Sequence, residues 1–208
     1  MHLLNASGSL MPFKKDIESI TKISVKKIVN VIPVSDVDIV LYEDPQSAIS
    51  HLGIGGYTPN AHLVFIPFDT RHKHLRNSIR ERLEGTIAHE LHHALRKRIL
   101  GYGDTLLEAM ISEGLADHFD IEITNKEPDQ WDTALTDKQM TAFHKKAKKE
   151  YFNKKYDRSA WFFGSKRKGI PKWAGYTLGF NIVSAYLKKH PDKKPSQLYR
   201  TRAEEFIG

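Results

Sequence analysis

Apolar residues in the first third of the chain predict one amphipathic helix followed by two strands. Isoleucines recur between lysines and other polar residues over 14–31, a pattern typical of a helix with one buried face. Two short apolar runs, Val37–Tyr42 and Ala61–Phe68, favour strands. Pro67 indicates that the second strand lies at a sheet edge. The Gly-rich segment 53–60 is turn-like and could shape the rim of a cleft.

A longer apolar repeat predicts a helix from Ser78 to Leu100. Ser78 and Glu81 form a capping-box pattern at its start, and Gly101 follows basic residues at its end. Gly85 weakens this interpretation, because glycine inside a helix costs about 1 kcal/mol relative to alanine. The apolar stripe of this helix consists of Ile79, Leu83, Ile87, Leu91, Ala94 and Leu95.

The remainder of the chain has a mainly helical pattern. Thr105 and Glu108 form a second capping-box pattern, which marks the start of another helix. Further helices are expected over Asp137–Tyr151, from Pro171 onward, and from Pro195 to Phe206. The expected core plug of this part consists of Trp161, Phe162 and Phe163.

These elements predict an α+β fold in a single domain of 208 residues. A small N-terminal sheet is expected to pack on the 78–100 helix, in an α/β part of about residues 1–100. A mainly helical part of about residues 101–208 completes the domain. Gly175 and Gly179, four residues apart, would permit a close contact between helices or an approach to the 78–100 helix.

The segment His89-Glu90-Leu91-His92-His93 is an H-E-x-x-H motif within the 78–100 helix. Residues four apart lie one turn apart on the same face, so His89 and His93 can bind one Zn²⁺. Glu90 can take a proton from a metal-bound water without binding the metal itself. His92 points about 100° away from His93 and is not expected to be a ligand. The alternative is a charged helix surface that carries histidines by chance.

A third ligand is expected, because catalytic zinc usually has three protein ligands and one open position. Glu113 follows His93 by 20 residues, which leaves room for a turn and a returning helix. Asp117, one turn further on, could accept the second ring N–H of a ligand histidine. His118 is a rival ligand, although its helical phase differs from that of Glu113. Alternatively, Glu113 and Asp117 are ordinary surface carboxylates.

This pattern resembles the gluzincin group of zinc metallopeptidases, in which a helix with E-x-x-x-D follows H-E-x-x-H. The metzincin pattern H-E-x-x-H-x-x-G-x-x-H and the aminopeptidase pattern G-x-M-E-N are absent. Three segments in order, TIAHELHHALR, TLLEAMISEGLADHF and PKWAGYTLGFNIVSAYL, resemble the DUF2268 family of predicted Zn-dependent proteases. They extend from Thr86 to Leu187. The resemblance implies a zincin-like fold and a zinc-dependent peptidase activity.

The same resemblance places a tyrosine, Tyr176, in a G-Y-x-x-G segment. A phenol O–H near the zinc could donate to the oxyanion formed during peptide hydrolysis, an effect of about 3 kcal/mol for one good donor. Tyr176 is therefore the expected oxyanion stabiliser, ahead of Tyr102 and Tyr57, with Arg96 and His74 as weaker alternatives. A buried aromatic side chain at a helix start is the competing interpretation.

The composition changes this interpretation little. Lys and Arg number 32 against 25 Asp and Glu, a net charge of +7, and basic residues concentrate at 145–155, 166–168 and 188–202. Such runs are usually solvated helix faces, and an acidic partner is the alternative. No nucleic-acid-binding motif accompanies them, so no nucleic acid is expected as partner.

Two features that the sequence lacks bear on the cellular compartment in which the protein is expected. The chain has no cysteine, which excludes disulfides, and no run of 18 apolar residues, so no membrane span is expected. Residues 1–15 contain no apolar leader segment. A cytoplasmic location is therefore expected, with secretion still open.

The sequence thus predicts a zinc-dependent peptidase that acts on a peptide or protein. His89, His93 and Glu113 would bind Zn²⁺, which this ligand set favours over Mn²⁺ or Co²⁺, and Glu90 would act as general base. One alternative is a non-catalytic zinc-binding module that recognises an acidic protein partner. Another is a protease dedicated to one regulatory protein. The substrate, endo- or exopeptidase action and the oligomeric state stay open.

Overall fold

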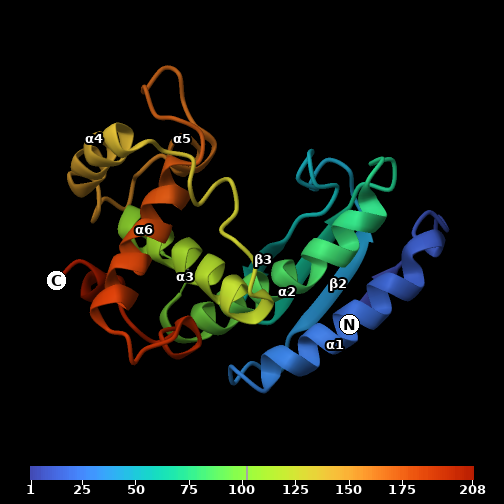
Figure 1. Cartoon of the computed structure of the whole chain (residues 1–208). Helices are drawn as coiled ribbons and strands as arrows, with labels where there is room; N and C mark the ends of the chain where they lie inside the picture. Colours follow the sequence, from blue (N-terminus) through green and yellow to red (C-terminus); the bar gives the residue numbers. More distant parts are fainter. Residues whose placement is uncertain (102) are drawn as a thin grey trace. The chain divides into compact units, whose positions relative to one another are not determined.

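Apolar side chains build a small mixed sheet in the N-terminal part of the chain (Figure 1). The strands are β1 (His2–Leu4), β2 (Asp38–Glu43), β3 (Tyr57–Asn60) and β4 (Leu63–Phe68), in the order β1-β2-β4-β3. β1, β2 and β4 run parallel, whereas β3 is antiparallel to β4. Successive side chains of a strand point to opposite faces, so every second residue of β4 shares one face of the sheet. The residues of that face, Val64, Ile66 and Phe68, are fully buried.

The prediction that Pro67 marks an edge strand is wrong. β4 lies between β2 and β3. Pro67 is tolerated there because it is the second-last residue of β4 and its carbonyl still accepts a hydrogen bond from the Gly55 N–H at 3.1 Å. The edge next to β4 is instead β3, inside the segment predicted to be turn-like. Its sequence, YTPN, has no apolar alternation from which a strand could be predicted.

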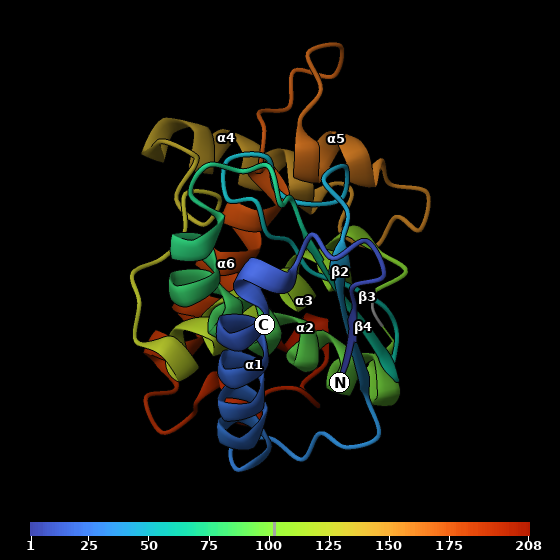
Figure 2. The same ribbon diagram turned by 90° about the vertical axis from the view of Figure 1, so that its right-hand side faces the viewer.

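Two helices accompany the sheet, α1 (Lys14–Val29) and α2 (Leu75–Leu100). Both agree with the predicted helices, and Figure 2 shows α1 running beside the sheet. Arg76 of α2 donates to Asp16 of α1 at 2.7 Å, which links the two helices. α2 begins three residues earlier than predicted, so Ser78 lies inside the helix and does not cap it.

The structure is a computed structural model that describes residues 1–101 and 103–208. These residues divide into two units, Met1–Arg98 and Ile99–Gly208. The first unit holds the sheet, and the described part of the second is helical. This confirms the α+β prediction, whereas the expectation of a single domain stays a prediction. Within the described residues, no helix is long and apolar enough to cross a membrane.

The long helix that follows in the second unit begins with the predicted capping box. Oγ1 of Thr105 accepts from the Glu108 N–H at 3.3 Å, and Oε2 of Glu108 accepts from the Thr105 N–H at 2.9 Å. This reciprocal pair satisfies two N–H groups that a helix start otherwise leaves unpaired. The helices of this unit are α3 (Leu106–Thr124), α4 (Asp137–Lys148), α5 (Arg158–Phe163) and α6 (Ala174–Lys189).

Two details of the C-terminal part differ from expectation. The helix predicted from Pro195 to Phe206 is two short 3₁₀ turns, Pro195–Gln197 and Ala203–Phe206. Leu198 adopts φ −96° and ψ 3°, outside the α-helical region, which ends the first turn. Trp161 and Phe162 are buried as expected, but Phe163 is 61% exposed.

A glycine contact brings α3 and α6 together. A Cβ placed on Gly114 would lie 2.5 Å from the carbonyl carbon of Gly179, and a Cβ on Gly179 would overlap the carbonyl oxygen of Met110. The backbones therefore touch at a point where no side chain fits. Of the two α6 glycines, Gly179 makes the expected close helix contact, which fixes the position of α3 against α6, whereas Gly175 lies against the ring of Phe162.

Replacing Gly179 by alanine should destabilise the second unit. The added methyl group meets backbone rather than a flexible side chain, so we expect a loss of about 3 kcal/mol, the upper end for overpacking. Thermal unfolding would show this as a fall of roughly 6–12 °C in Tm. The matched control is Asn181→Ala, at an exposed position of the same helix, which should change Tm little. Equal Tm values for the two variants would contradict the contact.

Candidate metal centre

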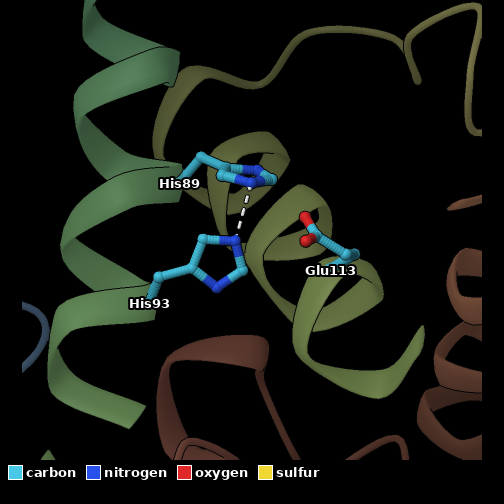
Figure 3. A group of neighbouring side chains, drawn as sticks. All are labelled: His89, His93 and Glu113. Atoms are coloured by element: carbon cyan, nitrogen blue, oxygen red, sulfur yellow. Dashed lines mark hydrogen bonds between the residues drawn. The ribbon is translucent and has the colours of Figure 1, made fainter. Parts of the chain in front are cut away.

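Two imidazole rings on α2 form the centre of the candidate site (Figure 3). Nε2 of His89 and Nε2 of His93 lie 3.0 Å apart, and the ring planes meet at 85°. The pair arises because four residues advance the helix by about one turn. Nitrogens bound to one tetrahedral zinc at 2.0–2.1 Å lie about 3.3 Å apart, so the rings need little movement to hold an ion.

Glu90 is buried beside this pair, with an exposed fraction of 6%. Oγ1 of Thr58, on β3, donates to Oε2 of Glu90 at 2.6 Å. The carbonyl of Thr58 in turn accepts from Nζ of Lys97, two turns further along α2. The edge strand therefore holds the carboxylate that the sequence indicated as general base. Neither Thr58 nor Lys97 was singled out from the sequence for this role.

Glu113 is buried on α3 and has a cationic neighbour within its own unit. Nη2 of Arg158 lies 3.2 Å from Oε1 of Glu113, and the guanidinium carbon lies 4.7 Å from the ring centroid of Phe162. Arg158 was not predicted, because 45 residues separate it from Glu113 and no local pattern connects them. The ion pair compensates part of the cost of burying a carboxylate.

One ligand atom from each of His89, His93 and Glu113 lies within 4.8 Å of the other two (Figure 3). Two imidazole nitrogens and one carboxylate oxygen are a donor set that zinc uses at catalytic sites. These three residues could therefore hold a metal ion. Among the described residues, no other group of three or more His, Asp or Glu side chains meets the same condition.

Asp117, the expected orienting carboxylate, lies beside a second buried aspartate, Asp132. Oδ2 of Asp132 accepts from the Asp129 N–H at 2.8 Å. Oδ1 of Asp132 has no donor among the described residues, and the carboxyl group faces Asp117. Burial and the adjacent Asp117 carboxylate raise the pKa of Asp132 to about 9. This surrounding favours the protonated form of Asp132, which can donate to Asp117.

The other charges of this region pair with one another. Nζ of Lys126 lies 2.5 Å from Oδ2 of Asp120 and 2.6 Å from Oδ2 of Asp129. Burial lowers the pKa of Lys126, but the two carboxylates together raise it by more, so the pKa lies above its ordinary value. The ammonium group therefore stays charged and neutralises this part of the acidic cluster.

The structure does not group the rival ligand His118 with the motif histidines. Nδ1 of His118 lies 2.7 Å from the carbonyl oxygen of Gly114, so this nitrogen donates. Nε2 lies 2.9 Å from Oγ of Ser184 on α6. Burial lowers the pKa of His118 against the raising effect of the Gly114 carbonyl. A neutral ring with both nitrogens in hydrogen bonds is a structural link between α3 and α6.

Tyr176 lies on α6 and packs against the helical core of the second unit. Its ring meets that of Phe162 edge to face, with centroids 5.0 Å apart. Its role as oxyanion stabiliser stays a prediction. Of the other tyrosines considered, Tyr57 is 62% exposed on β3 and Tyr102 lies outside the described residues.

Comparison with known proteins agrees with the resemblance of the three motif segments. The family described as "Predicted Zn-dependent protease (DUF2268)" matches residues 17–208. A protein of Bacillus subtilis (strain 168) with the name "Uncharacterized protein YjaZ" is 35% identical over 109 residues. The matched part is 49% of this chain and 41% of that relative, so the match spans less than half of the relative's length. No solved structure matches the chain.

The Asp117–Asp132 contact predicts a pH-dependent stability. The folded pKa of Asp132, about 9, lies above the ordinary aspartate value of 3.8, so the folded state keeps a proton that the unfolded state releases. The free energy of unfolding therefore falls as pH rises from about 4 towards 9, by at most about 1.4 kcal/mol per pH unit. Asp132→Asn keeps a donor towards Asp117 without titrating. Its Tm relative to wild type should rise steadily between pH 5 and 8.

A suitable control for this titration is Asp192→Asn, at an exposed position of the same unit. Its Tm difference from wild type should not depend on pH over this range. A Tm difference for Asp132→Asn that is equally flat would show that Asp132 is already charged at pH 5, contrary to the expected shared proton.

Proposed function

The chain belongs to the family of predicted Zn-dependent proteases, DUF2268, and on this basis we propose that it is a zinc peptidase of the gluzincin type. The observation that supports this most strongly is the group of His89, His93 and Glu113, whose ligand atoms lie within 4.8 Å of one another. We include the zincin-like arrangement of the fold in the same proposal.

The donor set fits zinc rather than a harder cation. Mg²⁺ and Ca²⁺ prefer oxygen ligands, whereas two imidazoles with one carboxylate suit zinc and leave a fourth position open. A bound zinc ion supplies a water acidified to a pKa of about 7 and an electrophile for the scissile carbonyl. The chain's own residues must then position the peptide and move the proton.

Glu90 is the proposed general base. Its carboxylate lies on the residue next to His89, is held by Thr58, and in the proposed reaction takes the water proton and delivers it to the leaving amine. Asp117 would accept the second N–H of a ligand histidine and fix its orientation. Tyr176 would donate to the developing oxyanion.

The buried, held carboxylate of Glu90 favours catalysis over the alternative of a non-catalytic zinc module. Binding zinc needs only the three ligands, and burying an additional carboxylate beside them costs free energy. A catalytic base, by contrast, has to sit next to the ligands. The proposed substrate is a peptide or protein, and a protease dedicated to one regulatory protein would use the same site.

Metal content tests the ligand set directly. Wild-type protein purified without added metal should contain about one zinc per chain by elemental analysis, and Glu113→Ala should contain much less, because a three-ligand site loses one donor. Glu127→Ala, at an exposed position that follows α3, is the control and should keep its zinc. Full zinc content in Glu113→Ala would assign the third ligand elsewhere.

The rate of peptide hydrolysis tests the proposed role of Glu90 as general base. Glu90→Gln keeps the shape of the side chain but cannot take a proton, so it should retain zinc and lose roughly 10²–10⁴-fold in kcat. The measurement is hydrolysis of casein and of a peptide library by zinc-loaded protein. Glu81→Gln, exposed on the same helix, should behave like wild type. Peptide hydrolysis by Glu90→Gln at the wild-type rate would overturn this mechanism.

A further inference from the structure

Two residues of the sheet edge contact the carboxylate of Glu90, and the sequence motif accounts for neither. Thr58 lies within β3, and Gly56 directly precedes this strand. We propose that Thr58 is a positioning residue for Glu90, which holds the carboxylate in the orientation needed for proton transfer while Gly56 leaves room for it. This inference rests on the proposed peptidase function and identifies a further residue on which that reaction depends.

The hydroxyl of Thr58 has two acceptors on Glu90. Oγ1 lies 2.6 Å from the carboxylate oxygen Oε2 and 3.0 Å from the backbone carbonyl oxygen of the same residue. One hydroxyl carries one proton, and the shorter contact to a charged group is the stronger hydrogen bond. Thr58 is 3% exposed, so water does not compete for the carboxylate on this side. Among the described residues, the carboxylate is therefore held by one buried donor.

Gly56 accommodates the other carboxylate oxygen. A Cβ on Gly56 would lie 2.5 Å from Oε1 and 2.7 Å from Cγ of Glu90. Gly56 is not among the glycines with positive φ, so its backbone does not require glycine. The missing side chain instead gives the Glu90 carboxylate its space. One oxygen is thus held by Thr58, while the other lies against the backbone of Gly56.

The strand that carries Thr58 is itself fixed at several points. β3 pairs with β4 through Tyr57 opposite Phe65 and Asn60 opposite Leu63, with an irregularity between the two pairs. Lys97 of α2 donates to the Thr58 carbonyl within this irregular stretch. Thr58 therefore contacts α2 through both its hydroxyl and its carbonyl. A hydroxyl held this rigidly can fix a partner to within a few tenths of an ångström, the accuracy that a positioned base requires.

The two acceptors also match the two states of a base during turnover. While Glu90 is a carboxylate, the hydroxyl donates to it. Once Glu90 carries the transferred proton on Oε1, the hydroxyl can keep donating to Oε2 or turn to the backbone carbonyl of Glu90, 3.0 Å away. Thr58 thus keeps a hydrogen-bond partner in both states.

The test compares Thr58→Val, which removes only the hydroxyl, with Thr58→Ser, which restores it. Zinc-loaded Thr58→Val should keep about one zinc per chain and the wild-type KM, and lose about 10- to 100-fold in kcat. Thr58→Ser should recover kcat to within about threefold of wild type. The matched control is Thr86→Val, which removes a hydroxyl that donates to the Arg82 carbonyl on the same helix and should leave kcat unchanged.

A wild-type kcat in Thr58→Val would overturn the proposal. So would equally slow Val and Ser variants, since the loss would then not follow the hydroxyl, and so would loss of zinc from Thr58→Val. Loss of kcat in Thr58→Val together with its recovery in Thr58→Ser supports the proposal.

A second measurement does not require turnover. The Tm loss of Thr58→Val should be smaller in a Glu90→Leu background than in wild type, because the hydroxyl then has no carboxylate to hold. Additive Tm shifts would show that the contact is absent and overturn the proposal. The Tm shifts of the two substitutions could be coupled while the wild-type protein hydrolyses no peptide. That result would refute the peptidase function and, with it, a positioning role for Thr58.

Discussion

Burial of polar side chains on α2 is the constraint on which the rest of the structure depends. Over nearly two turns this helix buries Glu90, His92, His93 and Arg96, all with exposed fractions below 9%. Burying such groups costs several kcal/mol each unless partners compensate. A helix with one apolar stripe would have needed only an apolar surface to pack on. This helix requires polar partners, and the Thr58 hydroxyl on β3 is one of them.

The second unit shows a related arrangement around its own carboxylates. Glu113 pairs with Arg158, Asp117 contacts the neutral Asp132, and Lys126 bridges Asp120 and Asp129. Each pairing lowers the net charge buried at that place and so compensates part of the free-energy cost of burying a carboxylate. The glycine contact between α3 and α6 holds the helix on which Glu113 and Asp117 sit. The proposed zinc ion would add a double positive charge to a ligand set that already contains one carboxylate.

Features with a local pattern could be predicted from the sequence. The α1 helix follows from isoleucine spacing, the start of α3 from the Thr105 capping box, and the candidate ligands from residues four apart on a helix. The strand β3 could not be predicted, because a four-residue segment with a proline has no alternation. The predicted C-terminal helix was wrong because Leu198 leaves the helical region after one turn.

The partners of the candidate site depend on contacts between distant segments. Thr58 reaches Glu90 across 32 residues and Arg158 reaches Glu113 across 45, and neither separation has a periodic signature. The elevated pKa of Asp132 likewise follows from burial, which composition does not determine. The motif therefore indicates which residues could bind the metal and take the proton. The fold determines which residues hold them in place.

The other proposals depend on the binding of one zinc ion by His89, His93 and Glu113. The most direct test is anomalous diffraction from crystals of the zinc-loaded protein, with data collected on both sides of the zinc absorption edge. Zinc bound by these three residues should give one strong peak at about 2.0–2.2 Å from Nε2 of each histidine and from a carboxylate oxygen of Glu113. A peak whose nearest side chains exclude Glu113, or no peak beside the two histidines, would contradict it.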